Sequence, residues 1–471
     1  MILDLTGHDR LYDLQSIAGA FFPGESFREG EPHIESILAG DACLTRITGE
    51  AGRAEAKEAL TGRDKDALRR AVKRSFYKAA SAYTGFSPEW GTFTGIRPAK
   101  EYLKYEDERA FLGEFGMKEE KARLCKDTVA AREGLFLPTG ERDFSLYLCI
   151  PFCPSRCDYC SFISGAGEKM LGLIPAYLEK LTEETKALAV FAAERGLTLR
   201  SIYIGGGTPA VLSAEQLSAL CASIRENFDL SACAEFTVEL GRPDAITKEK
   251  LVSVREGGAD RVCVNPQTLS DGVLASIGRK HTCARFFEAL SAAKSCGFRA
   301  INCDLIAGLP GDTEESFAAS VERLISEGVE NITVHTLCLK QGSRFKSDEA
   351  QIVRGLRAAG MVNASAAALR AAGYRPYYIY KQKQAIAALE NVGWEKGGTA
   401  SLYNILMMDD MGTVLGAGCG ASSKVVGGKS PLRVYAPKYP YEYLRLPSHA
   451  DKLAALSAAF AQIGVEKTGK R

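Results

Sequence analysis

Three cysteines that follow one apolar segment constrain this chain more than any other feature. Cys153, Cys157 and Cys160 stand in a C-x3-C-x2-C spacing soon after the apolar run 144–150. Such a run is typical of a β-strand, and Pro151 turns it into a loop that carries the cysteines. Thiolates bind soft metal centres, and iron–sulfur clusters are held by them. A cubane cluster held by only three thiolates keeps one iron with an open position, where a small molecule can bind and react.

The same cysteines also allow a partial zinc site. Structural zinc sites pair their ligands by C-x2–4-C, and Cys149 would be the fourth ligand here. The ferredoxin run C-x2-C-x2-C-x3-C-P has a different spacing and supplies a fourth cysteine of its own. Spacing alone therefore leaves an iron–sulfur cluster and a zinc site open.

The wider pattern Y-x-x-I-P-F-C-x-x-x-C-x-Y-C, residues 147–160, resembles the signature of the radical SAM superfamily. Within it, the pattern is similar to the oxygen-independent coproporphyrinogen III oxidase family. The segments T-G-I-R-P (94–98), Y-N-I-L-M-M (403–408) and the Gly-rich 416–423 resemble its HemZ-type branch, the coproporphyrinogen dehydrogenases. The resemblance implies a [4Fe-4S] cluster on Cys153, Cys157 and Cys160. It also implies that S-adenosylmethionine (SAM) chelates the open iron and is cleaved to a 5′-deoxyadenosyl radical.

Length and composition set the frame for this hypothesis. A chain of 471 residues predicts about three domains. The net charge of +1 gives no indication of a nucleic-acid partner, and 14 cysteines are too dilute for a disulfide scaffold. We find no signal peptide and no apolar run of about 18 residues, so no membrane span is expected. The expected location is the cytoplasm, where thiols stay reduced.

Strands and helices alternate from residue 144 onward, which predicts an α/β fold with a parallel sheet. The expected strands are 144–150, 201–204, 236–239, 261–265, 300–306 and 332–339. The expected helices are 173–195, 214–227, 248–256, 284–296 and 314–327. Six units are too few for a closed eight-stranded barrel. The resemblance implies a partial (β/α)6 TIM-like radical SAM barrel, and the number of units agrees with it.

Three regions are expected along the chain. Residues 1–140 are predicted to form a small N-terminal α/β domain with strands at 1–6 and 42–48 and a helix at 65–83. Residues 141–372 form the partial barrel, and residues 373–471 form a C-terminal α+β extension on the substrate side. Ser213 with Gln216, and Asp312 with Glu315, have the spacing of capping boxes at two helix starts.

Polar residues stand at successive strand ends, where ligands bind in parallel α/β folds. The second strand ends in Gly205-Gly-Gly-Thr-Pro209, whose glycines let the backbone approach a ligand. Glu239 ends the third strand, Gln267 follows the fourth, and Asp304 lies in the apolar fifth strand. Each suits an ordinary buried polar group, whereas together they are typical of a ligand site.

The family resemblance assigns SAM contacts to several of these positions. Arg279 matches the position for the SAM carboxylate, which a guanidinium fork suits well. Tyr147 and Tyr159 match positions beside the cluster and the adenine, and Ala307 would contribute through its backbone. The remaining positions implied to contact SAM are Gly206, Gly207, Thr208, Glu239, Gln267 and Asp304.

The resemblance implies oxidative decarboxylation of two propionates of coproporphyrinogen III to vinyl groups, giving protoporphyrinogen IX in haem biosynthesis. The partners would be the tetrapyrrole substrate and an electron donor such as flavodoxin or ferredoxin. Positive side chains are expected at the mouth of a site for four carboxylates. The candidates are Arg97, Arg344, Lys424 and Arg433, although each taken singly is more typical of an ordinary surface charge.

Two departures leave alternatives open. Family members carry His where this chain has Cys149, and Cys where it has Phe162. Haem chaperones related to the family keep Phe at the second position, but their H-N-x-x-Y-W haem-binding motif is absent from this sequence. A haem-binding chaperone and a radical SAM haem-modifying methyltransferase are therefore the alternative functions.

Overall fold

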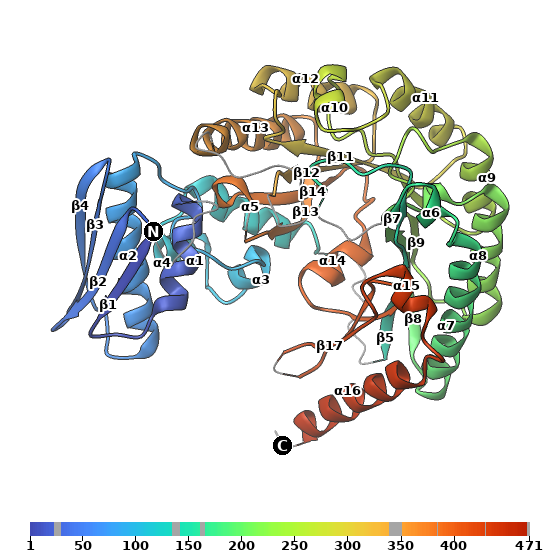
Figure 1. Cartoon of the computed structure of the whole chain (residues 1–471), viewed down its shortest axis with the longest axis horizontal. Helices are drawn as coiled ribbons and strands as arrows, with labels where there is room; N and C mark the ends of the chain where they lie inside the picture. Colours follow the sequence, from blue (N-terminus) through green and yellow to red (C-terminus); the bar gives the residue numbers. More distant parts are fainter. Residues whose placement is uncertain are drawn as a thin grey trace.

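A small four-stranded sheet forms the N-terminal lobe (Figure 1). The computed structural model describes residues 1–22, 30–133, 142–160, 165–338, 351–383, 385–428 and 430–468. The predicted strands at 1–6 and 42–48 and the helix at 65–83 are confirmed, whereas β2 and β4 were not predicted. The elements are β1 (Ile2–Thr6), α1 (Leu11–Phe21), β2 (His33–Ala39), β3 (Ala42–Gly49), β4 (Gly52–Ala59) and α2 (Lys65–Thr84).

A large mixed sheet forms the rest of the fold, and the six strands predicted for the barrel are its parallel centre. They are adjacent in chain order: β5 (Asp143–Ile150), β8 (Thr198–Gly206), β9 (Glu235–Val238), β10 (Arg261–Cys263), β11 (Ala300–Ala307) and β12 (Asn331–Thr336). Figure 1 shows the intervening helices as an outer arc. They are α7 (Ile174–Glu194), α8 (Ala214–Asn227), α9 (Lys248–Glu256), α10 (Asp271–Ser276), α11 (Cys283–Lys294) and α12 (Glu314–Ser326).

Strands of the C-terminal region extend both edges of this sheet. β15 (Thr413–Ala417) pairs in parallel with β5, and the antiparallel β16 (Ser422–Val425) and β17 (Leu432–Tyr435) follow. At the other edge, β14 (Glu390–Glu395) pairs antiparallel to β12, and β13 (Arg375–Lys381) lies beyond it. Within the described residues the sheet therefore ends at β13 and β17 and does not close into a barrel. The limits of the three predicted regions stay a prediction.

Shorter and peripheral elements complete the fold. They are α3 (Pro98–Tyr102), α4 (Glu108–Phe115), α5 (Glu119–Ala130), β6 (Phe152–Cys153), β7 (Gly165–Ala166), α6 (Glu168–Leu171), α13 (Gln351–Ala371), α14 (Leu402–Met408), α15 (Pro440–Leu444) and α16 (Ala450–Thr468). In the described part of the chain, no helix has both the length and the apolar character that a membrane span requires.

One of the two predicted capping boxes is wrong. Ser213 accepts from the Gln216 N–H and the Gln216 side chain accepts in return, as predicted. At the start of α12, however, Thr313 is the N-cap, and its hydroxyl accepts from the Ser316 N–H at 3.2 Å. Asp312 lies one residue too early and accepts from the Thr313 N–H instead, at 3.0 Å.

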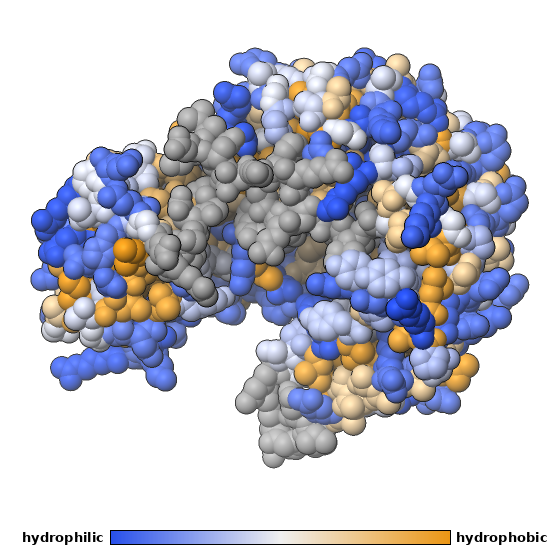
Figure 2. Space-filling view, in the orientation of Figure 1, coloured by the Kyte–Doolittle hydropathy of each residue, from blue (hydrophilic) through white to orange (hydrophobic). Residues whose placement is uncertain are grey.

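The loop that begins at Trp90 joins the N-terminal part of the chain to β14, a strand of the C-terminal region. The indole is buried, and its Nε1 donates to the Glu390 carboxylate at 2.7 Å. Lys121, on α5, lies 2.5 Å from the other oxygen of Glu390 and 3.1 Å from Glu89. The face drawn in Figure 2 is mostly hydrophilic, with apolar residues gathered on the N-terminal lobe and around the C-terminal elements.

Candidate active site

Backbone hydrogen bonds hold the cysteine loop at the carboxyl end of β5. The Asp158 N–H donates to the Ile277 carbonyl at 3.0 Å, and the Cys160 N–H donates to the Cys157 carbonyl at 3.1 Å. Cys153 lies on β6, which pairs with β7. All 14 cysteines lie in the described ranges and none forms a disulfide.

Glycines at the end of β8 let this strand touch the cysteine loop. A Cβ on Gly207 would lie 2.4 Å from the Phe152 carbonyl oxygen, closer than any carbon side chain can approach. The Gly207 N–H donates to the Ile150 carbonyl and the Thr208 N–H donates to that of Phe152, both at 2.8 Å. Gly206 also has φ +118°, a conformation that favours glycine. The G-G-G-T-P segment is therefore required for packing, apart from any ligand.

The three cysteines and the strand ends line one cavity of about 280 Å³. Eleven of the 13 residues predicted for the site lie in its wall. They are Cys153, Cys157, Cys160, Tyr159, Gly206, Gly207, Thr208, Glu239, Gln267, Arg279 and Asp304. Their roles toward a ligand stay a prediction.

Tyr147 and Ala307 lie outside this wall. The Tyr147 ring stacks on that of Tyr403 with centroids 6.2 Å apart, and neither residue lines this cavity. Ala307 is fully buried, and its carbonyl accepts from the Leu337 N–H at 3.0 Å. Cys149 is also absent from the wall, and burial raises the pKa of its thiol to about 12. The geometry therefore disfavours the zinc alternative, which needs Cys149 as the fourth ligand.

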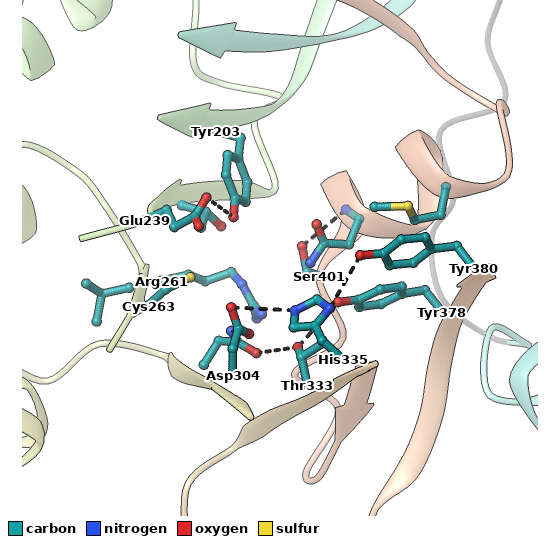
Figure 3. Close-up of a pocket in the computed structure, with 15 residues that line it drawn as sticks. Tyr203, Glu239, Arg261, Cys263, Asp304, Thr333, His335, Tyr378, Tyr380 and Ser401 are labelled. Atoms are coloured by element: carbon teal, nitrogen blue, oxygen red, sulfur yellow. Dashed lines mark hydrogen bonds and ion pairs between the residues drawn. The ribbon is translucent and has the colours of Figure 1, made fainter. Parts of the chain in front are cut away.

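Polar contacts link side chains at the ends of the barrel strands and on β13 (Figure 3). The Tyr203 hydroxyl donates to Glu239 Oε2 at 2.9 Å. Asp304 Oδ2, on β11, lies 3.7 Å from Nε2 of His335, on β12. The Nδ1 atom of His335 lies 3.3 Å from the hydroxyl of Tyr380, on β13.

This arrangement separates the pKa values of the two carboxyl groups. Burial, reinforced by the nearby charge of Asp304, raises the pKa of Glu239 to about 7. Burial also works to raise the pKa of Asp304, but contacts with His335 and Asn302 outweigh it and hold that pKa below its usual value. Burial alone would lower the pKa of His335. The contact with the Asp304 carboxylate has the larger effect, so the pKa of His335 is raised. Near neutral pH, the site thus holds an anionic Asp304 beside a partly protonated Glu239.

Gln267 and Arg279 present buried polar atoms that have no protein partner. The Oε1 atom of Gln267 and the Nε atom of Arg279 are both buried and unpaired. Gln267 also has φ +69°, which is uncommon for a residue with a side chain and is typical of functional sites. Arg279 uses Nη2 to donate to the carbonyls of Gly241 and Asn265, at 3.0 and 2.7 Å. Only part of its guanidinium therefore remains for a ligand.

A second, inner cavity of about 140 Å³ adjoins the first, and Glu239, Asp304, His335 and Tyr380 line both. The barrel strands, β13 and α14 supply its other polar side chains. These include Tyr203, Arg261, Asn302, Thr333, Tyr378, Ser401 and Asn404.

The positive side chains proposed for the mouth of the site lie elsewhere. Arg97, Lys424 and Arg433 converge on Asp410, at 2.7, 3.2 and 3.2 Å. Lys424 pairs with Val414 on β15, near the starting ends of β15 and β5, whereas the cysteines follow the far end of β5. The expectation that these three line the mouth is therefore wrong. Arg344 and Phe162 lie outside the described residues.

The cavity wall holds twelve further residues that were not predicted for the site, among them Arg242 and His335. Arg242 contacts Cys157, and its signal was the G-R-P-D segment directly after the third strand. His335 carried no local signal, because its role follows from the pairing of β12 with β11.

Comparison with known proteins identifies the family. The sequence model of the radical SAM superfamily matches residues 147–324. The oxygen-independent coproporphyrinogen-III oxidase-like protein HemZ of Bacillus subtilis (strain 168) is 32% identical over 98% of both chains. This chain belongs to the same family.

The heme chaperone HemW of Lactococcus lactis is 38% identical, over 43% of this chain and 51% of that protein. The coproporphyrinogen III oxidase HemN of Escherichia coli has a similar fold, with a TM-score of 0.52 and 23% identity over 67% of this chain and 71% of that one.

The residues present fit the cofactors of the radical SAM superfamily, a [4Fe-4S] cluster and SAM. Three thiols face one cavity, and Gln267 and Arg279 offer unpaired polar atoms beside them. In the described residues, no group of three His, Cys, Asp or Glu side chains converges as ligands of a single ion.

Proposed function

We propose that this protein is an oxidoreductase, a coproporphyrinogen dehydrogenase of the radical SAM type. The reaction is the oxidative decarboxylation of two propionates of coproporphyrinogen III to vinyl groups, which gives protoporphyrinogen IX in haem biosynthesis. The similarity to HemZ over 98% of both chains carries this proposal, since it extends well beyond the barrel. The cavity that joins three cysteines to polar strand ends supports it.

Cys153, Cys157 and Cys160 are the proposed ligands of the cluster. The Gly206–Gly207–Thr208 segment and the unpaired atoms of Gln267 and Arg279 would then bind the amino acid part of SAM. The remaining proposed contacts to SAM are Tyr147, Tyr159, Glu239, Asp304 and Ala307.

When bound, the cluster and SAM supply a carbon radical that removes one hydrogen atom from the β-carbon of a propionate. The carboxyl group then leaves as CO2, and one electron passes to an acceptor, which leaves the vinyl group. The chain's own contribution is to orient SAM and exclude water. Glu239, Asp304 and His335 would hold charges and protons at fixed atoms beside the cysteines.

The size of the cavity bears on where the tetrapyrrole binds. Cavities for drug-sized ligands are roughly 300–1,000 Å³. A space of about 280 Å³ lies just below this range, so it does not hold a tetrapyrrole in addition to SAM. The substrate would therefore approach SAM from outside this cavity. A low-potential donor such as flavodoxin or ferredoxin would supply electrons.

Haem binding is the second candidate function, because several relatives carry the name heme chaperone HemW. His335 lines both cavities and is the candidate axial ligand among the described residues. A haem-modifying methyltransferase is the third candidate.

One anaerobic assay separates these functions. The protein is reconstituted with iron and sulfide and mixed with SAM, dithionite and either coproporphyrinogen III or haem. We expect stepwise loss of two CO2 from coproporphyrinogen III, measured by mass, together with 5′-deoxyadenosine. Stoichiometric haem binding without decarboxylation would refute the proposal in favour of the chaperone, and a methylated or ring-opened haem in favour of the methyltransferase.

A further inference from the structure

Arg242 reaches from the end of β9 to the cysteine loop. Its side chain is only 4% exposed. Its Nη1 atom donates to Cys157 Sγ at 3.1 Å, and its Nη2 atom donates to Ser155 Oγ at 2.9 Å. One guanidinium thus binds both a predicted cluster ligand and the loop that carries it.

Asp244 fixes the orientation of this guanidinium. Its two carboxylate oxygens accept from Arg242 Nε and Nη2, at 2.9 and 2.8 Å. Such a two-point contact gives both strength and a defined geometry. A guanidinium stays protonated over the whole physiological pH range, so the positive charge of Arg242 is permanent.

A second guanidinium also approaches this sulfur. Nη1 of Arg279 lies 3.7 Å from Cys157 Sγ, farther than the 3.1 Å of Arg242. Arg279 is held by backbone carbonyls, whereas Arg242 is held by a carboxylate. Arg242 and Asp244 therefore determine the charge close to Cys157, and each of them can be substituted without changing the other.

Charge and hydrogen bonds at the ligand sulfurs tune the reduction potential of iron–sulfur clusters. We propose that Arg242 is a positioning residue that raises the potential of the cluster through Cys157, and that Asp244 holds it in place and partly offsets its charge. Reduction adds one electron from an external low-potential donor, so a fixed positive charge beside the ligand stabilises the reduced state. No bond forms or breaks in this step.

The test is a redox titration of the reconstituted protein with dithionite and mediators, followed by electron paramagnetic resonance, with iron content measured in parallel. We expect Arg242→Gln to lower the midpoint potential and Arg242→Lys to keep it near that of the wild type. Asp244→Asn should raise it, because it removes the compensating negative charge. Arg299→Gln is the matched control, since Arg299 is an exposed arginine paired with Asp260 at 2.6 Å, and it should leave the potential unchanged.

Two results would overturn the proposal. One is an unchanged potential in Arg242→Gln at full iron content. The other is a shift of the midpoint potential in the same direction in Arg242→Gln and Asp244→Asn. That result is expected if the two residues only support the structure of the loop. If Arg242→Gln does not load iron, the midpoint potentials of Arg242→Lys and Asp244→Asn test the proposal instead. The titration contains no tetrapyrrole, so its outcome is independent of the substrate proposed above.

Discussion

Glu239 is expected to destabilise the fold at neutral and alkaline pH. Its pKa rises from the usual 4.5 to about 7 because the carboxyl group is buried and faces Asp304. A group whose pKa is higher in the folded state binds more protons there, so stability falls as pH rises through this window. At about 1.4 kcal/mol per pKa unit, ionising Glu239 costs the folded state roughly 3 kcal/mol above pH 7, and little below pH 4.5.

Glu239→Gln removes this cost and keeps the acceptor for the Tyr203 hydroxyl, which lies 2.9 Å away. We therefore expect the variant to be more stable than the wild type by about 3 kcal/mol at pH 8 but only about 1 kcal/mol at pH 5. Urea unfolding of the SAM-free protein at both pH values measures the difference. The exposed Glu226→Gln, on α8, is the matched control for the substitution itself. A stability gain that is equal at both pH values would refute the reasoning.

Three further predictions concern the surroundings of the site. Gly207→Ala should cost about 1–3 kcal/mol in urea unfolding and reduce iron loading, because its Cβ would lie 2.4 Å from the Phe152 oxygen; unchanged stability and iron content would contradict this packing. Asp304→Asn should lower the pKa of His335, since burial then acts without the opposing carboxylate, and NMR of labelled histidine should detect it; a pKa that stays raised would contradict it. Lys121→Ala should cost about 3–5 kcal/mol in urea unfolding because it leaves the buried Glu390 carboxylate without its cationic partner, whereas Glu89 keeps Lys118 at 2.7 Å; a loss below about 1 kcal/mol would show that Glu390 is neutralised or solvated.

The parallel centre of the sheet could be predicted because its strands read as apolar runs between helical segments. All six expected strands are present, and α8 and α9 begin and end at the expected residues. β2 and β4 could not be recognised in this way. β4 alternates between exposed and half-buried positions over the sequence G-R-A-E-A-K-E-A, which has no apolar face of its own. It is a strand because it pairs with β3.

The site was predictable where a residue lies at a strand end and not where its role depends on pairing between distant segments. The cysteine loop, Glu239 and Asp304 belong to the first kind. The contact of Arg242 with Cys157 joins positions 85 residues apart, and that of Tyr380 with His335 joins positions 45 apart. The expectation that Arg97, Lys424 and Arg433 line the mouth of the site was wrong, because the sequence alone does not tell at which end of the sheet a residue from a distant segment will lie.

The central claim is that Cys153, Cys157 and Cys160, and not Cys149, form a radical SAM centre. The most direct measurement is the yield of 5′-deoxyadenosine per protein, with iron content, after anaerobic reconstitution with SAM and dithionite. We predict that the wild type and Cys149→Ala bind iron and form 5′-deoxyadenosine, whereas Cys153→Ala, Cys157→Ala and Cys160→Ala lose both. Loss of iron in Cys149→Ala, or unchanged iron in the other three variants, would contradict the account.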